Sequence, residues 1–223
     1  MKNRTIVAIG IICLSFAGNA QAQDVSVASR EYREPEVARE RFVFGAKAGI
    51  NRSNVWDENG QDFKADAKSG FAGGFFFSIP VIPYIGIQPE ILVSQKGYQS
   101  TGTFLTVPYA NTRTTTYLDI PILFAFKPIQ YFTLLAGPQY SYLMNQKDVT
   151  SFGSGSSTTE QQFKNENVRK NIFGILVGAD VNIKHFVLSG RAGWDVSNNN
   201  GDGTSTTPRY KNQWLQFTLG FRI

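Results

Sequence analysis

The sequence predicts an all-β protein, an eight-stranded antiparallel transmembrane β-barrel. Two observations carry this prediction. From Phe42 onward, apolar side chains recur at every second position in eight separate stretches of 9–10 residues, which is the period of a β-strand with two different faces. The connections between these stretches alternate between short turns and long polar segments. Transmembrane barrels show this alternation, because their turns are tight on one side of the membrane and their loops are long on the other.

The predicted strands are stretches in which apolar or aromatic residues alternate with glycine, polar or charged residues. They cover 42–50, 70–79, 85–94, 117–126, 132–141, 173–181, 186–195 and 215–223. Strands of this length cross a bilayer when they are tilted. Pro89 and Pro121 lie inside two of them. Because proline cannot donate to a β-ladder, each predicts a bulge or a locally unpaired stretch.

The connections sort by length along the chain. Short turns are expected at 80–83, 127–130 and 183–185, and long segments rich in Ser, Thr, Asn and Gly at 51–68, 97–114, 144–168 and 197–210. A long loop follows every odd strand, and a short turn follows every even strand before the last. This order predicts short periplasmic turns and long external loops.

One face of each predicted strand is almost wholly apolar, and the other carries Gly, Ser, Thr, Gln and charged residues. The charged face could not form a dry core, because buried charges must be paired, so we expect the apolar face to contact lipid. Phe126, Phe132, Tyr142 and Trp194 lie near strand ends, where transmembrane barrels carry aromatic girdles. The alternative is a soluble lipocalin-like barrel whose apolar face lines a ligand cavity.

The first 41 residues stand apart from this pattern. Lys2 and Arg4 precede an apolar stretch at 6–17, and Ala-Gln-Ala at 20–22 provides the small-x-small sequence that signal peptidase cleaves. We therefore expect a signal peptide at 1–22, a charged periplasmic leader at 23–41 and the barrel at 42–223. The only cysteine, Cys13, lies in the predicted signal peptide, so a mature chain would have no disulfide and no thiol chemistry.

Charge and motifs argue against nucleic-acid binding and catalysis. Without Lys2 and Arg4, 20 basic residues (22 minus 2) stand against 17 acidic ones, and the basic residues do not cluster. The only histidine, His185, falls in a predicted periplasmic turn, far from the external loops. The sequence contains no nucleophile elbow and no metal-ligand spacing. We expect a non-enzymatic protein with no catalytic residues, no cofactor and no metal.

Charged residues on the inward face are the candidate internal site. An eight-stranded barrel has an interior just wide enough to be filled by side chains, so an open pore is not expected. Lys47, Glu90, Asp119 and Arg191 lie at similar distances from the predicted periplasmic ends. We expect these four to form a paired cluster at the waist of the barrel with a structural role, because interior charges need partners. Proton or ion conduction is the alternative role.

Four segments of the predicted strands carry distinctive sequences: GAKAGIN at 45–51, QPEIL at 88–92, YLDIPIL at 117–123 and GPQYSYL at 137–143. Together they resemble the PorT-type outer-membrane β-barrel family of Bacteroidetes. The resemblance covers about 42–223 and implies an eight-stranded barrel in the outer membrane of a Gram-negative bacterium. PorT itself is tied to type IX secretion, whereas most members of the family have no assigned role.

The expected function is therefore that of an integral outer-membrane protein with a structural or loop-mediated interaction role. Its expected partners are outer-membrane lipid, the barrel assembly machinery during insertion, and a protein that contacts the external loops or the leader. Aromatic residues in the predicted loops are the contact candidates: Trp56, Phe63, Phe104, Tyr109, Phe152 and Phe163. The alternatives are an accessory subunit of a secretion or transport machine and a soluble ligand-binding barrel.

Overall fold

The computed structural model describes residues 41–56, 65–104, 107–152, 155–161, 169–199 and 210–223, all of which lie in the compact unit Pro35–Ile223. Antiparallel β-strands make up nearly all of this part of the chain. They are β1 (Val43–Trp56), β2 (Asp66–Ile82), β3 (Ile85–Phe104), β4 (Val107–Ile129), β5 (Phe132–Phe152), β6 (Gly155–Gln161), β7 (Asn171–Ile183), β8 (Phe186–Asp195) and β9 (Lys211–Arg222). The described residues contain no helix with the length and apolar character that a membrane span requires.

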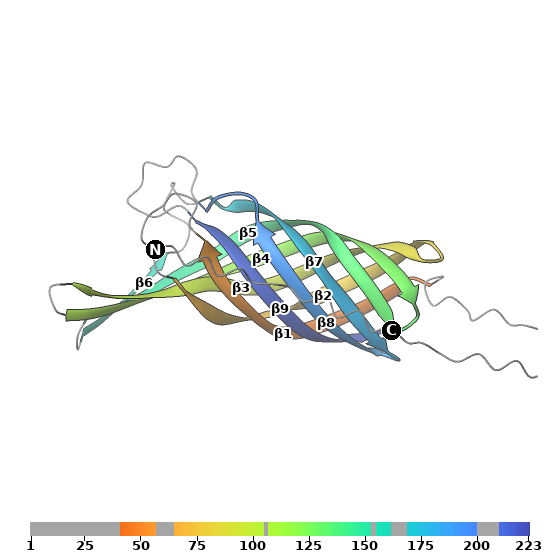
Figure 1. Ribbon diagram of the computed structural model, residues 1–223, viewed down its shortest axis with the longest axis horizontal. Helices are drawn as coiled ribbons and strands as arrows, with labels where there is room; N and C mark the ends of the chain where they lie inside the picture. Colours follow the sequence, from red (N-terminus) through yellow and green to blue (C-terminus); the bar gives the residue numbers. More distant parts are fainter. Residues whose placement is uncertain (1–40, 57–64, 105–106, 153–154, 162–168, 200–209) are drawn as a thin grey trace, which may run out of the picture. The chain divides into compact units, whose positions relative to one another are not determined.

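Eight of these strands close into a ring, in the order β1-β2-β3-β4-β5-β7-β8-β9. Antiparallel pairing of β9 with β1 closes it, from Gly45↔Arg222 to Trp56↔Lys211. The strands wind at a slant around a common axis (Figure 1). The predicted eight-stranded antiparallel barrel is therefore confirmed, and β6 is an additional strand outside the ring that pairs with β5.

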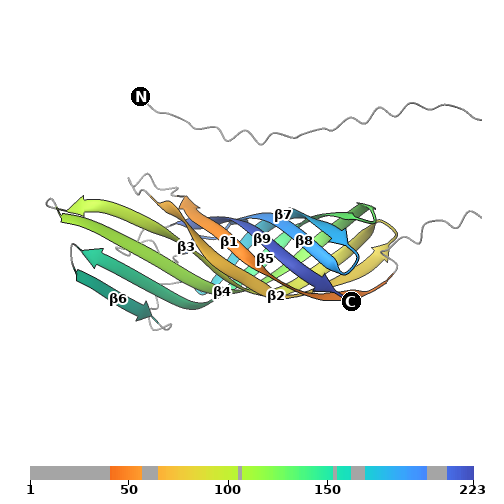
Figure 2. The same cartoon turned by 90° about the horizontal axis from the view of Figure 1, so that it is seen from below.

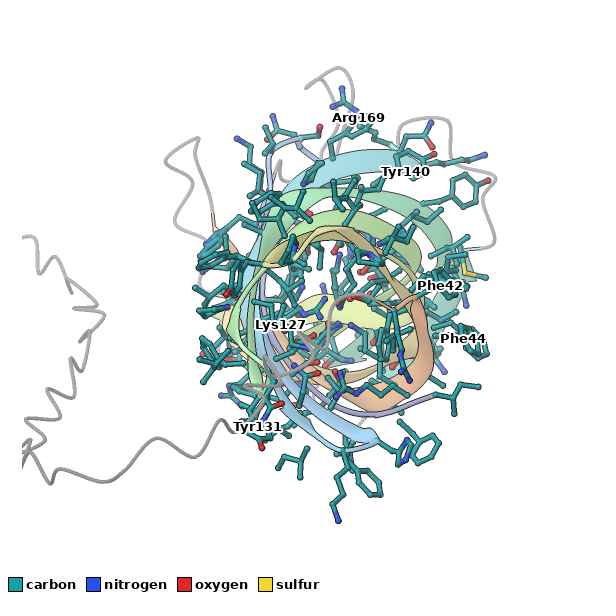
Figure 3. The ribbon with its side chains drawn as sticks, turned by 90° about the vertical axis from the view of Figure 1, so that its right-hand side faces the viewer. Phe42, Phe44, Lys127, Tyr131, Tyr140 and Arg169 are labelled. Carbon is teal, nitrogen blue, oxygen red and sulfur yellow. The ribbon has the colours of Figure 1, made fainter. Side chains whose placement is uncertain are left out.

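Three tight turns lie at one end of the ring, at 83–84, 130–131 and 184–185, where the sequence predicts short periplasmic turns. Each connects a strand to its antiparallel neighbour, and Lys184 adopts a left-handed conformation with φ 52°. Figure 3 looks into the ring from this end, with Lys127 inside it and Phe42, Phe44 and Tyr131 outside. The strands run further toward this end than predicted, since β2 reaches Ile82 and β4 reaches Ile129.

At the opposite end, strands continue through much of what the sequence predicts to be loops. β3 and β4 remain paired from Gly97↔Thr114 to Phe104↔Val107, and β5 extends to Phe152. The loop prediction is wrong for these residues and for β6. The reason is chemical: these extensions are polar on both faces, so they show no apolar alternation, while their many threonines fit an extended chain. The loop predictions for 57–64, 105–106, 153–154, 162–168 and 200–209 fall outside the described residues.

Both strand prolines interrupt a ladder without changing its register. Pro89 pairs with Ile122, and the β3–β4 ladder resumes at Leu92↔Asp119 in the same register. Pro121 similarly pairs with Gln139 before an interruption between β4 and β5. The predicted consequence is thus a locally unpaired stretch and not a bulge, because the missing N–H removes hydrogen bonds without adding a residue.

The two faces of the ring are opposite in character. Outward-facing apolar side chains are largely exposed, such as Ile50 at 59%, Phe217 at 55% and Leu219 at 58%. Inward-facing Asn51, Glu90 and Ser94 are fully buried. This is the arrangement of a barrel whose outer wall contacts lipid. It excludes the soluble alternative in which the apolar face lines an internal cavity.

Candidate functional site: the lumen and the external sheet

Charged side chains from four strands meet in the half of the lumen that is nearer the tight turns. Lys47 on β1 and Arg191 on β8 both bind the carboxylate of Glu90 on β3, with Arg191 Nη1 2.7 Å from Glu90 Oε1. Arg191 Nη2 also lies 3.1 Å from Asp180 Oδ1 on β7. Gln88 donates to both carboxylates, at 2.9 and 3.3 Å. Two cations and two anions therefore neutralise one another, and each carboxylate is hydrogen-bonded, as buried charges require.

A second charged group lies further from the turns. Asp119 accepts a hydrogen bond from Ser94 and pairs with Lys96, whose Nζ is 3.2 Å from Asp119 Oδ2. Lys96 Nζ also lies 3.8 Å from the centre of the Trp214 ring and 4.9 Å from that of Tyr117. The Lys96 side chain is completely buried. Its ammonium group is therefore held by a carboxylate and by two aromatic faces, both of which favour a cation.

The structure brings together three of the four inward charges singled out in the sequence, namely Lys47, Glu90 and Arg191. Asp119 does not join them, because β4 ends at Ile129 and places Asp119 ten residues from the strand end (129 minus 119). Glu90 is only five residues from the start of β3 (90 minus 85). A depth counted from Phe126, where the apolar alternation stops, is therefore too small for Asp119.

Sequence reasoning missed Asp180, Gln88 and Lys96. Asp180 and Gln88 occupy inward positions of predicted strands, so the alternation itself could have identified them. Lys96 lies two residues past the predicted end of its strand at Ser94, where the polar extension of β3 begins. Nothing in the apolar pattern marks it.

The external sheet is defined here as the paired parts of β3, β4, β5 and β6 that extend beyond the ring, at 97–104, 107–116, 144–152 and 155–161 (Figures 1 and 2). β4 pairs with β5 from Tyr109↔Phe152 to Thr116↔Asn145. β5 pairs with β6 from Gln146↔Gln161 to Phe152↔Gly155. Among the described strands β6 has β5 as its one neighbour, so its other edge is open.

An ion pair and an aromatic cluster support the base of this sheet. Arg113 on β4 binds Asp148 on β5 through two hydrogen bonds of 2.7 and 2.9 Å. The guanidinium lies 5.8 Å from the Tyr98 ring, which makes an edge-on contact with Tyr210 beside Val55. Burial acts to lower the pKa of Arg113, but Tyr210, Asp148 and Tyr98 raise it above its ordinary value. The guanidinium therefore stays charged.

Gly97 stands where β3 leaves the ring. Its φ is +144°, and a Cβ at this position would lie 2.0 Å from the carbonyl oxygen of Arg113. Ser53 fixes the same residue, since its hydroxyl accepts from Gly97 N at 2.9 Å and donates to Gly97 O at 2.8 Å. Only glycine fits this close approach of two backbones.

The predicted contact aromatics lie, wholly or by their side chains, outside what the structure describes. Phe63 and Phe163 lie outside the described residues, and the side chains of Trp56, Phe104, Tyr109 and Phe152 are also outside what the structure describes. The backbone of Trp56 belongs to β1, and those of the other three belong to the external sheet or its base. Their role in contacting a partner remains a prediction.

His185 lies in the turn between β7 and β8, at the opposite end of the ring from the external sheet. Its Nδ1 is 3.1 Å from the carbonyl oxygen of Arg222, and its ring stacks on Phe221 at 5.6 Å. The imidazole thus packs the turn against β9. It is far from the charged groups of the external sheet.

Several solved structures are similar to this chain in fold at low identity. Ail of Yersinia pestis, crystallised with the heparin analogue sucrose octasulfate, is 12% identical with a TM-score of 0.45, covering 82% of this chain and 99% of Ail. Neisserial surface protein A is 10% identical with a TM-score of 0.43, covering 81% and 96% of the two chains. OprG from Pseudomonas aeruginosa is 13% identical with a TM-score of 0.37, covering 81% and 95%.

No curated protein sequence matches the chain. The family described as outer membrane protein beta-barrel domain matches residues 19–221, which is most of the sequence. The closed ring of eight strands, with an apolar outer wall and a charged interior, is the structure expected of such a domain. The chain therefore belongs to the outer membrane protein beta-barrel domain family, and it is an outer-membrane β-barrel.

Proposed function

We propose that this protein is a non-enzymatic outer-membrane barrel that presents the external sheet to a protein partner outside the cell. The observation that carries the proposal is the open edge of β6 at 155–161, since β6 pairs on one side with β5. An open edge offers a row of backbone donors and acceptors to an extended segment of another protein. The expected partner is therefore an extracellular protein that adds a strand to β6.

The internal chemistry supports a binding role over a catalytic one. Lys47, Glu90, Asp180 and Arg191 neutralise one another in the lumen through ion pairs. The external sheet, by contrast, is held in a fixed register and is braced by Arg113 and Asp148. A braced sheet loses little conformational freedom on binding, and this favours affinity.

Adjacent proline substitutions on β6 provide the test. Successive N–H groups of a strand point to opposite edges, so of Ser157→Pro and Thr158→Pro one removes a hydrogen bond to β5 and the other removes only an open-edge donor. A photo-crosslinking amino acid in place of Ser156 reports contact with the partner when intact cells are illuminated in their natural surroundings. We expect one dominant adduct that the open-edge proline abolishes. Equal adducts in both variants and the parent would contradict strand addition.

We also propose that 1–22 is a signal peptide and that 23–41 is a periplasmic leader. Lys2, Arg4, the apolar stretch at 6–17 and the Ala-Gln-Ala at 20–22 support this. N-terminal sequencing of the protein from purified outer membranes should begin at Gln23. Recovery of the protein with Met1 intact would overturn the assignment.

A PorT-like role as an accessory subunit of a secretion machine is the second candidate, supported by the resemblance of 88–92, 117–123 and 137–143. Docking would then use the leader or the lipid-facing wall. Extraction with a gentle detergent should recover the barrel with other envelope proteins, and deletion of the gene should leave secreted cargo in the periplasm. Normal secretion in the deletion strain would eliminate this role and leave the external partner untouched.

A further inference from the structure

The inner wall made by β8 and β9 changes character at one position. Trp214 is the one large apolar side chain among the inward residues of β9, which are Asn212, Trp214, Gln216, Thr218 and Gly220. Trp214 pairs across the strands with Gly193 of β8, and it is only 3% exposed. A large apolar ring therefore fills the lumen between polar groups on either side.

Polar atoms without a hydrogen-bonding partner lie on both sides of this ring. Buried polar atoms in this position are normally satisfied by ordered water. Toward the turns, these atoms are Ser189 Oγ, Arg191 Nε, Gln216 Oε1 and Thr218 Oγ1. Toward the external sheet, they are Asp195 Oδ1 and Asn212 Oδ1. Polar groups that can bind water therefore lie on both sides of Trp214, toward the turns and toward the external sheet.

Trp214 itself is packed on all sides that the structure describes. It joins an apolar cluster with Leu123, Leu135 and Leu176. A Cβ on Gly193 would lie 2.3 Å from Trp214 Cζ2, so the ring rests directly against the backbone of β8. The Lys96 ammonium covers the ring at 3.8 Å and is itself held by Asp119.

We propose that Trp214, held in place by Lys96, is the barrier to ions in this barrel and separates two hydrated compartments. An apolar constriction blocks ions because water leaves it, and an ion cannot cross a dry segment cheaply. The Trp214 ring, called the plug from here on, closes the path that ions would take through the barrel. Removing the indole ring joins the two compartments.

The charged side chains on the two sides of the plug differ in net charge. On the side of the external sheet, Lys96, Asp119 and Asp195 contribute one positive and two negative charges, a net of −1. On the side of the turns, Lys47, Arg191 and the buried Lys127 outnumber Glu90 and Asp180 by one, and Arg222 lines the same pocket as Asp180. The path therefore has no net negative charge, and an opened lumen should pass anions as well as cations.

The test compares two tryptophans on adjacent strands, in planar bilayers containing the full-length barrel. Trp214→Ala removes an indole ring from the lumen. Trp194→Ala removes an indole ring from the outer wall, where Trp194 is 38% exposed. We expect Trp214→Ala to raise ion flux at least about tenfold over the parent, since the constriction becomes wettable. Trp194→Ala should leave the flux at the parent level.

A second pair covers the case in which Trp214→Ala does not fold. Leu176→Ala thins the same layer, and Leu219→Ala removes an equal volume from the lipid face, where Leu219 is 58% exposed. A smaller rise with Leu176→Ala and none with Leu219→Ala supports the plug. Parent-level flux in a folded Trp214→Ala barrel, or in Leu176→Ala if only that folds, overturns it. A parent barrel that already conducts as well as Trp214→Ala overturns it too.

Discussion

The ring and the external sheet share the same strands but are built from different residues. Along β4 the outward side chains are Phe124 and Ile122 in the ring, and the strand continues through Thr112 and Thr114 in the external sheet. Hydrogen bonding persists across this change, so the backbone path is the same. What changes is the surrounding medium: lipid demands an apolar outer wall, whereas water accepts threonine. The residue types along β4 therefore reflect whether lipid or water surrounds each segment, while the backbone conformation stays the same.

The largest effect should come from the ring interior. Glu90→Ala leaves Lys47 and Arg191 buried with one carboxylate fewer, and breaking a buried ion pair in this way costs about 3–5 kcal/mol. Urea unfolding in lipid vesicles measures the loss. Lys147→Ala, an exposed charge of the external sheet, is the matched change and should stay within about 0.5 kcal/mol. Equal midpoints for the two variants would show that the lumen network is not structural.

A charge on each outer surface tests the difference in medium directly. Phe217→Arg places a guanidinium on the lipid-facing wall and should destabilise the barrel by about 2–4 kcal/mol. Thr158→Arg, on exposed β6, should change stability by no more than about 0.5 kcal/mol. The same vesicle assay applies. If Phe217→Arg were tolerated as well as Thr158→Arg, the wall around β9 would not contact lipid.

Gly97→Ala should loosen the external sheet and spare the ring. The added Cβ clashes with the Arg113 carbonyl and forces a strained φ, at a cost of about 1–3 kcal/mol. Limited proteolysis of intact cells should then cleave β3 or β4 faster, while the heat-dependent gel shift of the ring is retained. Gly190→Ala is the control, because its Cβ would meet nothing closer than 3.6 Å. Unchanged proteolysis of Gly97→Ala would remove the need for glycine there.

The smallest effect is expected at the brace. Arg113 and Asp148 have side chains that are 12% and 19% exposed, whereas those of Arg191 and Glu90 are completely buried, so the coupling of Arg113 with Asp148 should be the weaker of the two. A double-mutant cycle with Arg113→Ala and Asp148→Ala measures it, and added salt should weaken it. Coupling as large as that of Arg191 with Glu90 would mean that the base of the external sheet is as dry as the lumen.

The ring was predictable because lipid imposes an alternation that survives in a single sequence. Phe71, Phe75 and Ile79 lie on one face of β2, and their spacing identifies both the strand and its lipid side. The external sheet was not predictable by the same means, because threonine and serine lie on both of its faces. β6, with the sequence GSSTTEQ, has no apolar residue to reveal a period.

The candidate site was partly predictable for a related reason. Inward position identifies Lys47, Glu90 and Arg191, and it would also have identified Asp180. The depth of these residues along the lumen could not be predicted in the same way, because it depends on where each strand begins and ends. Asp119 and Lys96 lie at a different level because β4 extends to Ile129 and β3 continues past Ser94. The apolar alternation stops where a strand leaves the lipid, whereas the strand itself continues beyond that point.

The charge network near the turns also bears on how the barrel is assembled. Lys47 and Glu90 balance each other within β1–β3, and Asp180 and Arg191 balance each other within β7–β8. The bond between Arg191 and Glu90 joins these two pairs across the lumen and spans 101 residues of sequence. It brings the first strands against the last, as does the backbone bond of 2.9 Å from Ile223 N to Phe44 O. Closure of the cylinder therefore adds a buried charged contact that neither group of strands makes alone.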